Sequence, residues 1–234
     1  MSADSILRLS RRDLFAAAGG TLVLAGCAGG GAQVKIYVLR PDLPNNPAGP
    51  KVKWELAVAT PYAPASLNIE RIALTRSTTM LDYFADSAWT DRLPTILQNC
   101  LVESFEASGR IAAVSRDTAG LKADYILETE VRDFAAHYET GGTTPDVVVR
   151  ITAKLVAVPE RTIVGTLDSL QHAQAAANSV EAVVSAFNVA LTASLRQIVD
   201  WTLSAPPSDL TGPPGPAIVP AHRHRRRRRR VSRA

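Results

Sequence analysis

The sequence is poor in the residues that carry most enzyme chemistry. Ahead of its C-terminal tail it has only two histidines, His137 and His172, and the whole chain has two cysteines. No glycine-rich phosphate loop, His-Glu-x-x-His or Gly-x-Ser-x-Gly pattern is present. Asp82, Asp86 and Asp91 cluster in sequence, but nothing in the pattern brings their carboxylates together as a metal or acid–base site. We therefore expect no enzyme, no metal and no non-covalent cofactor.

No run of about twenty apolar residues, the length of a transmembrane helix, occurs near the N-terminus. The apolar run there covers residues 16–25, which is too short to span a bilayer and is the length of a signal-peptide core. Arg11 and Arg12 precede it and, with Leu14 and Phe15, fit a twin-arginine export signal. The sequence therefore predicts export from the cytoplasm.

The apolar run ends in Leu24-Ala25-Gly26-Cys27, which resembles a bacterial lipobox. The resemblance implies cleavage before Cys27 and attachment of diacylglyceryl and N-acyl groups to it, and two acyl chains already give stable anchoring. Ala28 follows, rather than the aspartate of an inner-membrane retention signal, so we expect the periplasmic face of the outer membrane. The alternative is a short transmembrane anchor with a chance cysteine.

Charge is distributed unevenly along the chain. Lysine and arginine number 26 against 22 acidic residues, and eight arginines lie in the last thirteen residues. Without residues 1–26 and those thirteen, 15 basic and 20 acidic residues remain, so the central part is mildly acidic. The basic pI belongs to the tail and is no evidence for a nucleic-acid-binding fold.

A 3.6-residue period predicts an amphipathic helix near the middle of the chain. Its apolar stripe consists of Leu93, Ile96, Leu97, Cys100, Leu101 and Phe105, opposite the polar residues Gln98, Asn99, Glu103 and Glu106. We expect Thr90 as N-cap, Asp91 in the first turn, and Gly109 ending the helix in a left-handed turn; Pro94 is tolerated only near the start. In this stripe Cys100 is expected to be a small buried side chain and not a reactive thiol.

Apolar residues alternate with polar ones in several other segments. Alternation predicts strands at 54–58, 125–132 and 147–156. Further strands are expected at 36–39, 67–72, 111–114 and 162–171, with an extended segment at 80–89. A second amphipathic helix is expected over 178–202, with Asn178 as N-cap and Glu181 completing a capping box. The predicted fold is α+β: a mostly antiparallel sheet with two amphipathic helices packed on one face, a two-layer sandwich.

Four segments follow from these patterns: a signal peptide over 1–26, a lipidated tether over 27–34, one domain over 35–204, and a tail over 205–234. The tail has six prolines between residues 206 and 220, and then six consecutive arginines. That charge density excludes burial in a core. The arginines favour contact with anionic lipid or acidic polymer, at about 1 kcal/mol per residue near a charged membrane; the alternative is a solvated tail with no dedicated partner.

Several short motifs of the predicted domain resemble one family of envelope proteins. They are Tyr37-Val38-Leu39, Arg71-Ile72-Ala73-Leu74, Tyr83-Phe84-Ala85-Asp86 with Ala88-Trp89, the run from Glu103 to Arg110, and Ala123-Asp124-Tyr125-Ile126-Leu127. The chain is thereby similar to the ABC-type transport auxiliary lipoproteins, outer-membrane partners of Mce-type lipid transporters. The resemblance implies a lipid-anchored periplasmic component that contacts a Mce-type protein and catalyses no reaction.

Tyr83, Phe84 and Trp89 are the predicted contact surface, because aromatic residues beside small polar ones suit the centre of an interface. Burial of the same aromatics under the helix is the alternative, and self-association into a ring is also compatible with the pattern. The second functional hypothesis is an envelope lipoprotein that itself binds a hydrophobic ligand or has a structural role in the cell wall.

Overall fold

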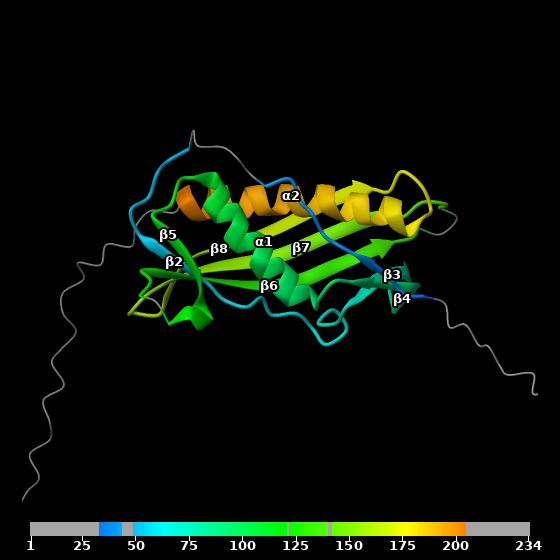
Figure 1. Ribbon diagram of the computed structural model, residues 1–234, viewed down its shortest axis with the longest axis horizontal. Helices are drawn as coiled ribbons and strands as arrows, with labels where there is room; N and C mark the ends of the chain where they lie inside the picture. Colours follow the sequence, from blue (N-terminus) through cyan, green and yellow to red (C-terminus); the bar gives the residue numbers. More distant parts are fainter. Residues whose placement is uncertain (1–32, 44–48, 121, 140–141, 205–234) are drawn as a thin grey trace, which may run out of the picture. The chain divides into compact units, whose positions relative to one another are not determined.

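The computed structural model describes residues 33–43, 49–120, 122–139 and 142–204 (Figure 1). The predicted export signal, the lipobox with Cys27 and the arginine-rich tail lie outside these residues. All helices and strands belong to the unit that begins at Lys35. In chain order they are β1 (Lys35–Tyr37), β2 (Glu55–Val58), β3 (Arg71–Ser77), β4 (Met80–Trp89), α1 (Leu93–Ser108), β5 (Ala113–Arg116), the 3-10 turn η2 (Asp117–Ala119), β6 (Tyr125–His137), β7 (Asp146–Ala157), β8 (Thr162–Gln174) and α2 (Val180–Ser204).

The sheet is built around the antiparallel meander β6–β7–β8, whose strands pair along nearly their full length. The other edge of β6 holds two shorter parallel strands, β2 at its start and β3 at its end. β5 then joins β2 in parallel, while β4 joins β3 antiparallel and β1 joins β4 in parallel. The eight-stranded sheet is therefore mixed, with long antiparallel ladders and short parallel ones.

Both helices lie on the same face of this sheet (Figure 1), with α2 over β7 and β8 and α1 beside it over β2 and β5. Their apolar sides meet the inward residues of the sheet in one core, where Phe105, Phe134 and Phe187 are fully buried. The predicted two-layer α+β fold is confirmed. The reason is the alternation along β6 and β7, which gives the sheet one apolar face for the helices to cover.

The start of α1 differs from the prediction. Arg92 is the N-cap and makes no side-chain cap bond, so the expected Thr90 cap is wrong. The expected Asp91 in the first turn is also wrong, because the helix begins only at Leu93. The backbone N–H of Thr90, directly after β4, donates to the Tyr37 carbonyl at 3.1 Å. Pro94 in the first turn has no N–H to be capped. The helix end is as predicted, because Gly109 has a left-handed φ of 61°.

Gln98, predicted on the polar face of α1, is buried instead, with 7% of its surface exposed. Its side-chain Nε2 donates to the backbone carbonyl of Val58 at 3.0 Å, which compensates the burial of the amide. A long polar side chain next to the apolar stripe thus bridges helix and sheet.

The start of α2 also differs. Ser179, not Asn178, caps the helix, because the Ala182 N–H donates to the Ser179 Oγ at 3.2 Å. The side chain of Asn178 instead accepts a hydrogen bond from the Tyr138 hydroxyl at 2.7 Å. Shifting the cap by one residue also removes the predicted capping box at Glu181.

The predicted strand at 67–72 starts too early. Residues 65–70 form turns, in which the N–H groups of Leu67 and Asn68 both donate to the Pro64 carbonyl, and β3 begins only at Arg71. The strand predicted at 111–114 is displaced to β5, while the extended segment predicted at 80–89 is β4. The remaining strands agree with the prediction within a few residues.

Candidate functional site

The face of the sheet that the helices leave open is polar, and we take it as the candidate site. Strand alternation and register place side chains of three neighbouring strands on it. They are Glu128, Glu130, Asp133 and His137 from β6, Asp146, Arg150, Thr152 and Lys154 from β7, and Thr166, Asp168, Leu170 and His172 from β8. Charges of both signs alternate across the strands, so this face suits a polar contact with a macromolecule.

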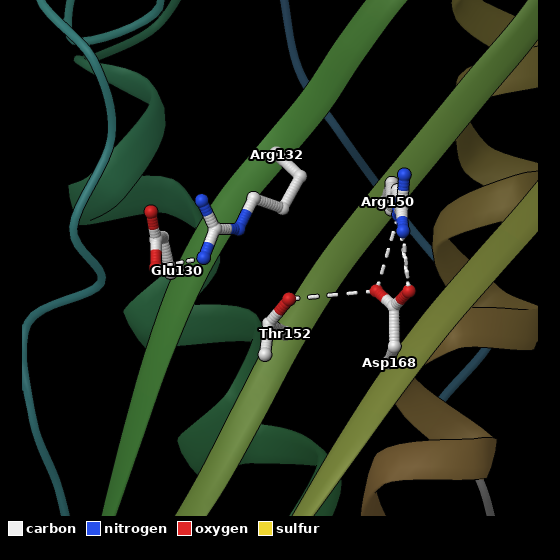
Figure 2. A network of polar contacts seen from close by, with 5 residues as sticks. All are labelled: Glu130, Arg132, Arg150, Thr152 and Asp168. Carbon is white, nitrogen blue, oxygen red and sulfur yellow. Dashed lines mark hydrogen bonds and ion pairs between the residues drawn. The ribbon is translucent and has the colours of Figure 1, made fainter.

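The centre of the open face carries a network of paired charges (Figure 2). Arg150 donates to both carboxylate oxygens of Asp168, with Nη2 at 2.7 Å from Oδ2 and Nε at 3.2 Å from Oδ1, and the Thr152 hydroxyl donates to Oδ1 at 3.4 Å. The ion pair lowers the pKa of Asp168 and raises that of Arg150. On β6, Arg132 and Glu130 form a second pair at 2.8 Å. These charges pair with one another and remain partly exposed on the open face.

Two histidine–aspartate pairs lie towards the end of this face that adjoins β3. His137 Nε2 lies 3.0 Å from an Asp133 carboxylate oxygen, and His172 Nδ1 lies 2.7 Å from Asp146. Hydrogen bonding to Asp133 raises the pKa of His137, while partial burial opposes the shift. His137 also contacts the Thr75 hydroxyl at 3.3 Å. Both imidazole rings thus lie on the surface, each paired with an aspartate of its own strand or of the neighbouring strand. This agrees with the surface position expected for His137.

A groove of about 1020 Å³, open to solvent, runs between these histidines and the β3–β4 hairpin. Met80 and Leu81 at the hairpin expose 56% and 39% of their surfaces and form one wall. Ala135 and Val148 belong to its apolar lining. Exposed apolar side chains beside paired charges make this end of the open face the most suitable part for docking a partner protein.

Trp89 is not part of any surface. It is 2% exposed and packs edge-on against Phe187 of α2 at 5.4 Å and Phe134 of β6 at 6.3 Å between ring centroids. Of the two predictions for this residue, burial is therefore correct, and Trp89 is removed from the candidate contact surface. Its inward direction follows from its place in β4 opposite Tyr37 of β1, which also packs on the core.

Tyr83 and Phe84 are half-buried, and both pack against the core. The Arg71 guanidinium lies over the Tyr83 ring at 4.2 Å from its centroid, and the Tyr83 hydroxyl donates to the Ser66 carbonyl at 3.1 Å. Asp86, two residues beyond Phe84, has a positive φ of 50° where the pairing with β3 shifts register. Tyr83 and Phe84 thus remain candidates for contact, on an irregular stretch of β4 next to the hairpin.

Cys100 is buried, as predicted, and burial raises the pKa of its thiol to about 12, so the thiol is inert. Within the described ranges, no group of three or more histidine, cysteine, aspartate or glutamate side chains is placed to hold a metal ion. Helix α2 is long and apolar enough to cross a membrane, but 56% of its apolar window is buried, and its apolar side covers β7 and β8. We therefore assign it as a core helix.

Sequence reasoning missed the buried Arg110. It is 3% exposed, its guanidinium pairs with Asp200 of α2, and its Nε donates to the Pro50 carbonyl at 3.3 Å. The Arg150–Asp168 pair was missed as well. Strand alternation put both residues on the polar face, but their contact depends on the register between β7 and β8, which no local pattern gives.

Comparison with known families shows which family the chain belongs to. The model for the ABC-type transport auxiliary lipoprotein component matches residues 37–199, which is nearly all of the described domain. The chain belongs to this family. The family is described as a transport auxiliary lipoprotein component, which is not an enzyme family.

Solved structures and a curated protein are also similar to this chain. A solved structure from Xanthomonas campestris is 31% identical, covers 72% of this chain and 94% of that chain, and has a TM-score of 0.68. A second solved structure, of an uncharacterized protein, is 17% identical with a TM-score of 0.55, covers 73% and 99% of the two chains, and shows the fold alone. An uncharacterized protein of Bradyrhizobium diazoefficiens is 30% identical over 192 residues, 78% of this chain. The matched region covers 50% of that curated relative, so this auxiliary lipoprotein spans about half its length.

Proposed function

We propose that this auxiliary lipoprotein is a lipid-anchored component of an ABC/Mce-type lipid transport system at the periplasmic face of the outer membrane. It acts by contact with the periplasmic Mce-type protein. The family match over residues 37–199 carries the proposal, together with the lipobox that ends at Cys27 in front of it. An acylated Cys27 supplies the membrane attachment that such a bridging component needs.

The grooves of the described domain favour contact over ligand carriage. A protein that carries a lipid needs a concave, largely apolar pocket that encloses it. The groove beside β3 and β4 is open to solvent and lined by charged side chains such as Arg76 and Arg132. A further groove of about 370 Å³ contains Glu128, Glu130 and Lys154 in its lining. Surfaces of this kind suit a polar rim around a protein contact.

The contact surface proposed for the Mce-type protein is the β3–β4 hairpin with the adjoining part of β4. Met80 and Leu81 are exposed there, and Tyr83 and Phe84 follow them on the same strand. Methionine and aromatic residues are enriched at interface centres. The two histidine–aspartate pairs of the open face lie across the groove from this hairpin and form its polar border.

The test is co-purification of the auxiliary lipoprotein with the Mce-type protein encoded beside it. We expect a complex at micromolar concentration, and Met80→Ser with Leu81→Ser to weaken it at least about tenfold, because the two changes remove apolar surface that the contact would bury. Ile163→Ser is the matched control, since Ile163 on β8 is 54% exposed. Absence of a complex, with extraction of phospholipid from vesicles by the isolated domain, would establish the carrier function instead.

A further inference from the structure

Strand β1 and the residue that directly follows it present apolar side chains to solvent at successive outward positions. Ile36 is 58% exposed and Val38 is 44% exposed, and we call these two residues the β1 stripe. Val34, two residues earlier, is 51% exposed. Side chains at i and i+2 of an extended segment point to the same side, so Ile36 and Val38 form one continuous apolar strip.

The direction of the β1 stripe is fixed by the other side of the strand. Tyr37 donates its hydroxyl to Glu181 of α2 at 2.8 Å, and Lys35 pairs with the same carboxylate at 3.4 Å. Leu39 is buried in the core. Because these alternate residues face α2 and the core, Ile36 and Val38 face away from the helices. The strand itself is held in the sheet by its parallel pairing with β4.

The β1 stripe lies close in sequence to the cysteine at which the chain is proposed to be acylated. Ile36 lies nine positions after Cys27, and the first five of the eight residues between them are glycines and alanines. Fully extended, nine residues reach at most about 30 Å. The stripe is therefore confined near the bilayer surface whenever Cys27 is anchored.

We infer that the β1 stripe rests on the membrane that holds Cys27, with Ile36 and Val38 at the boundary between headgroups and acyl chains. This inference rests on the proposed lipid anchor. Tethering raises the effective concentration of the stripe at the bilayer to the millimolar range, so two small apolar side chains suffice for contact without any vesicle affinity of the unanchored domain. The contact orients the domain, with the β1–β4–β3 end of the sheet towards the membrane.

The test measures the depth of single sites in the acylated full-length protein reconstituted into phosphatidylcholine vesicles. An environment-sensitive fluorophore is attached to Ile36→Cys or, as the control, to Ile163→Cys. Ile163 matches Ile36 in residue type and exposure, 54% against 58%, and lies on β8, the strand at the opposite edge of the sheet from β1. Labelling is selective because Cys27 is acylated and Cys100 is buried.

Spin-labelled lipid with the quencher near the headgroup should quench the probe at position 36 at least about threefold more than the probe at position 163. The change Val38→Asp should reduce the quenching at position 36 without releasing the protein from the vesicles, because a charge beside the probe disfavours insertion. Equal quenching at both positions in protein that floats with the vesicles overturns the inference and leaves the anchor intact.

Two other outcomes have separate meanings. Protein that lacks acyl groups and does not float with the vesicles refutes the anchor and, with it, this inference. A probe at position 36 that is shielded only after the Mce-type protein is added shows a protein contact at the β1 stripe, and overturns membrane contact while supporting the proposed function.

Discussion

Replacing Trp89 with alanine should destabilise the domain severely. The indole is 2% exposed and contacts the rings of Phe187 and Phe134, which connects β4 to α2 and to the centre of the sheet. Truncation of a buried tryptophan costs about 3–5 kcal/mol, because the cavity that remains closes only in part. In a domain of this size 1 kcal/mol lowers the melting temperature by about 2–4 °C, so we expect a decrease of about 6–20 °C.

The assay is thermal unfolding followed by circular dichroism, on the Cys27→Ser chain so that all variants are handled without detergent. A double-mutant cycle of Trp89→Leu with Phe187→Leu should give a coupling energy of about 0.5–1.5 kcal/mol, as expected for an edge-on aromatic pair. The control is Tyr62→Ala, since the Tyr62 side chain is 64% exposed. Its effect on the free energy of unfolding should stay within about 0.5 kcal/mol.

A melting temperature that is unchanged in Trp89→Ala would refute this reasoning, because a core indole cannot be removed without cost. If the same variant also lost the Mce-type partner, Trp89 would be an interface residue and the packing of β4 against α2 would be wrong. A loss of partner binding in proportion to the unfolded fraction alone agrees with the core assignment.

Four further predictions concern other parts of the chain. Leu97→Ala in α1 should lower the free energy of unfolding by about 2–5 kcal/mol, measured by urea denaturation, because Leu97 is fully buried. The hydrogen bond to Asp133 raises the pKa of His137 in the folded state, so protonated His137 stabilises the fold. This contribution is complete below the ordinary pKa of 6.5 and is lost as the pH rises through the folded pKa. The urea midpoints of wild type and His137→Gln should therefore converge with rising pH. Cys27→Ser should abolish outer-membrane fractionation, and recovery of that variant in the outer membrane in wild-type amounts would exclude the anchor. Deleting residues 206–234 should leave the melting temperature within about 1 °C and should reduce salt-sensitive binding to anionic vesicles.

The sequence was a good guide wherever the signal is local. The 3.6-residue period located α1 and α2, and the two-residue period located β6, β7 and β8, because each element must hide one side from water. Gly109 marked the end of α1, since few other residues adopt its left-handed backbone conformation without cost. The short motifs along the domain also indicated the family, which the match over residues 37–199 confirms.

Caps and polar bridges were less predictable, because several residues of the right type compete for each role. Asn178 and Ser179 are both good N-caps, and only the position of Tyr138 shows why the serine is used. Gln98 has a polar side chain, yet it is buried, and its amide donates to the Val58 carbonyl of β2.

The sequence by itself therefore determined the elements, the two-layer class and the family, because periodicity, capping chemistry and motifs are properties of neighbouring residues. Only the tertiary structure decided which aromatic residues are core and which are surface. Trp89 and Tyr83 are six residues apart on one strand. Trp89 is buried against Phe187, about a hundred residues later in the chain, whereas Tyr83 stays half-exposed beside Arg71. The pairing of Arg150 with Asp168 and of Arg110 with Asp200 likewise depends on strand register and helix packing. Register and packing are set by the burial of the whole apolar surface at once, so no local stretch of sequence contains them.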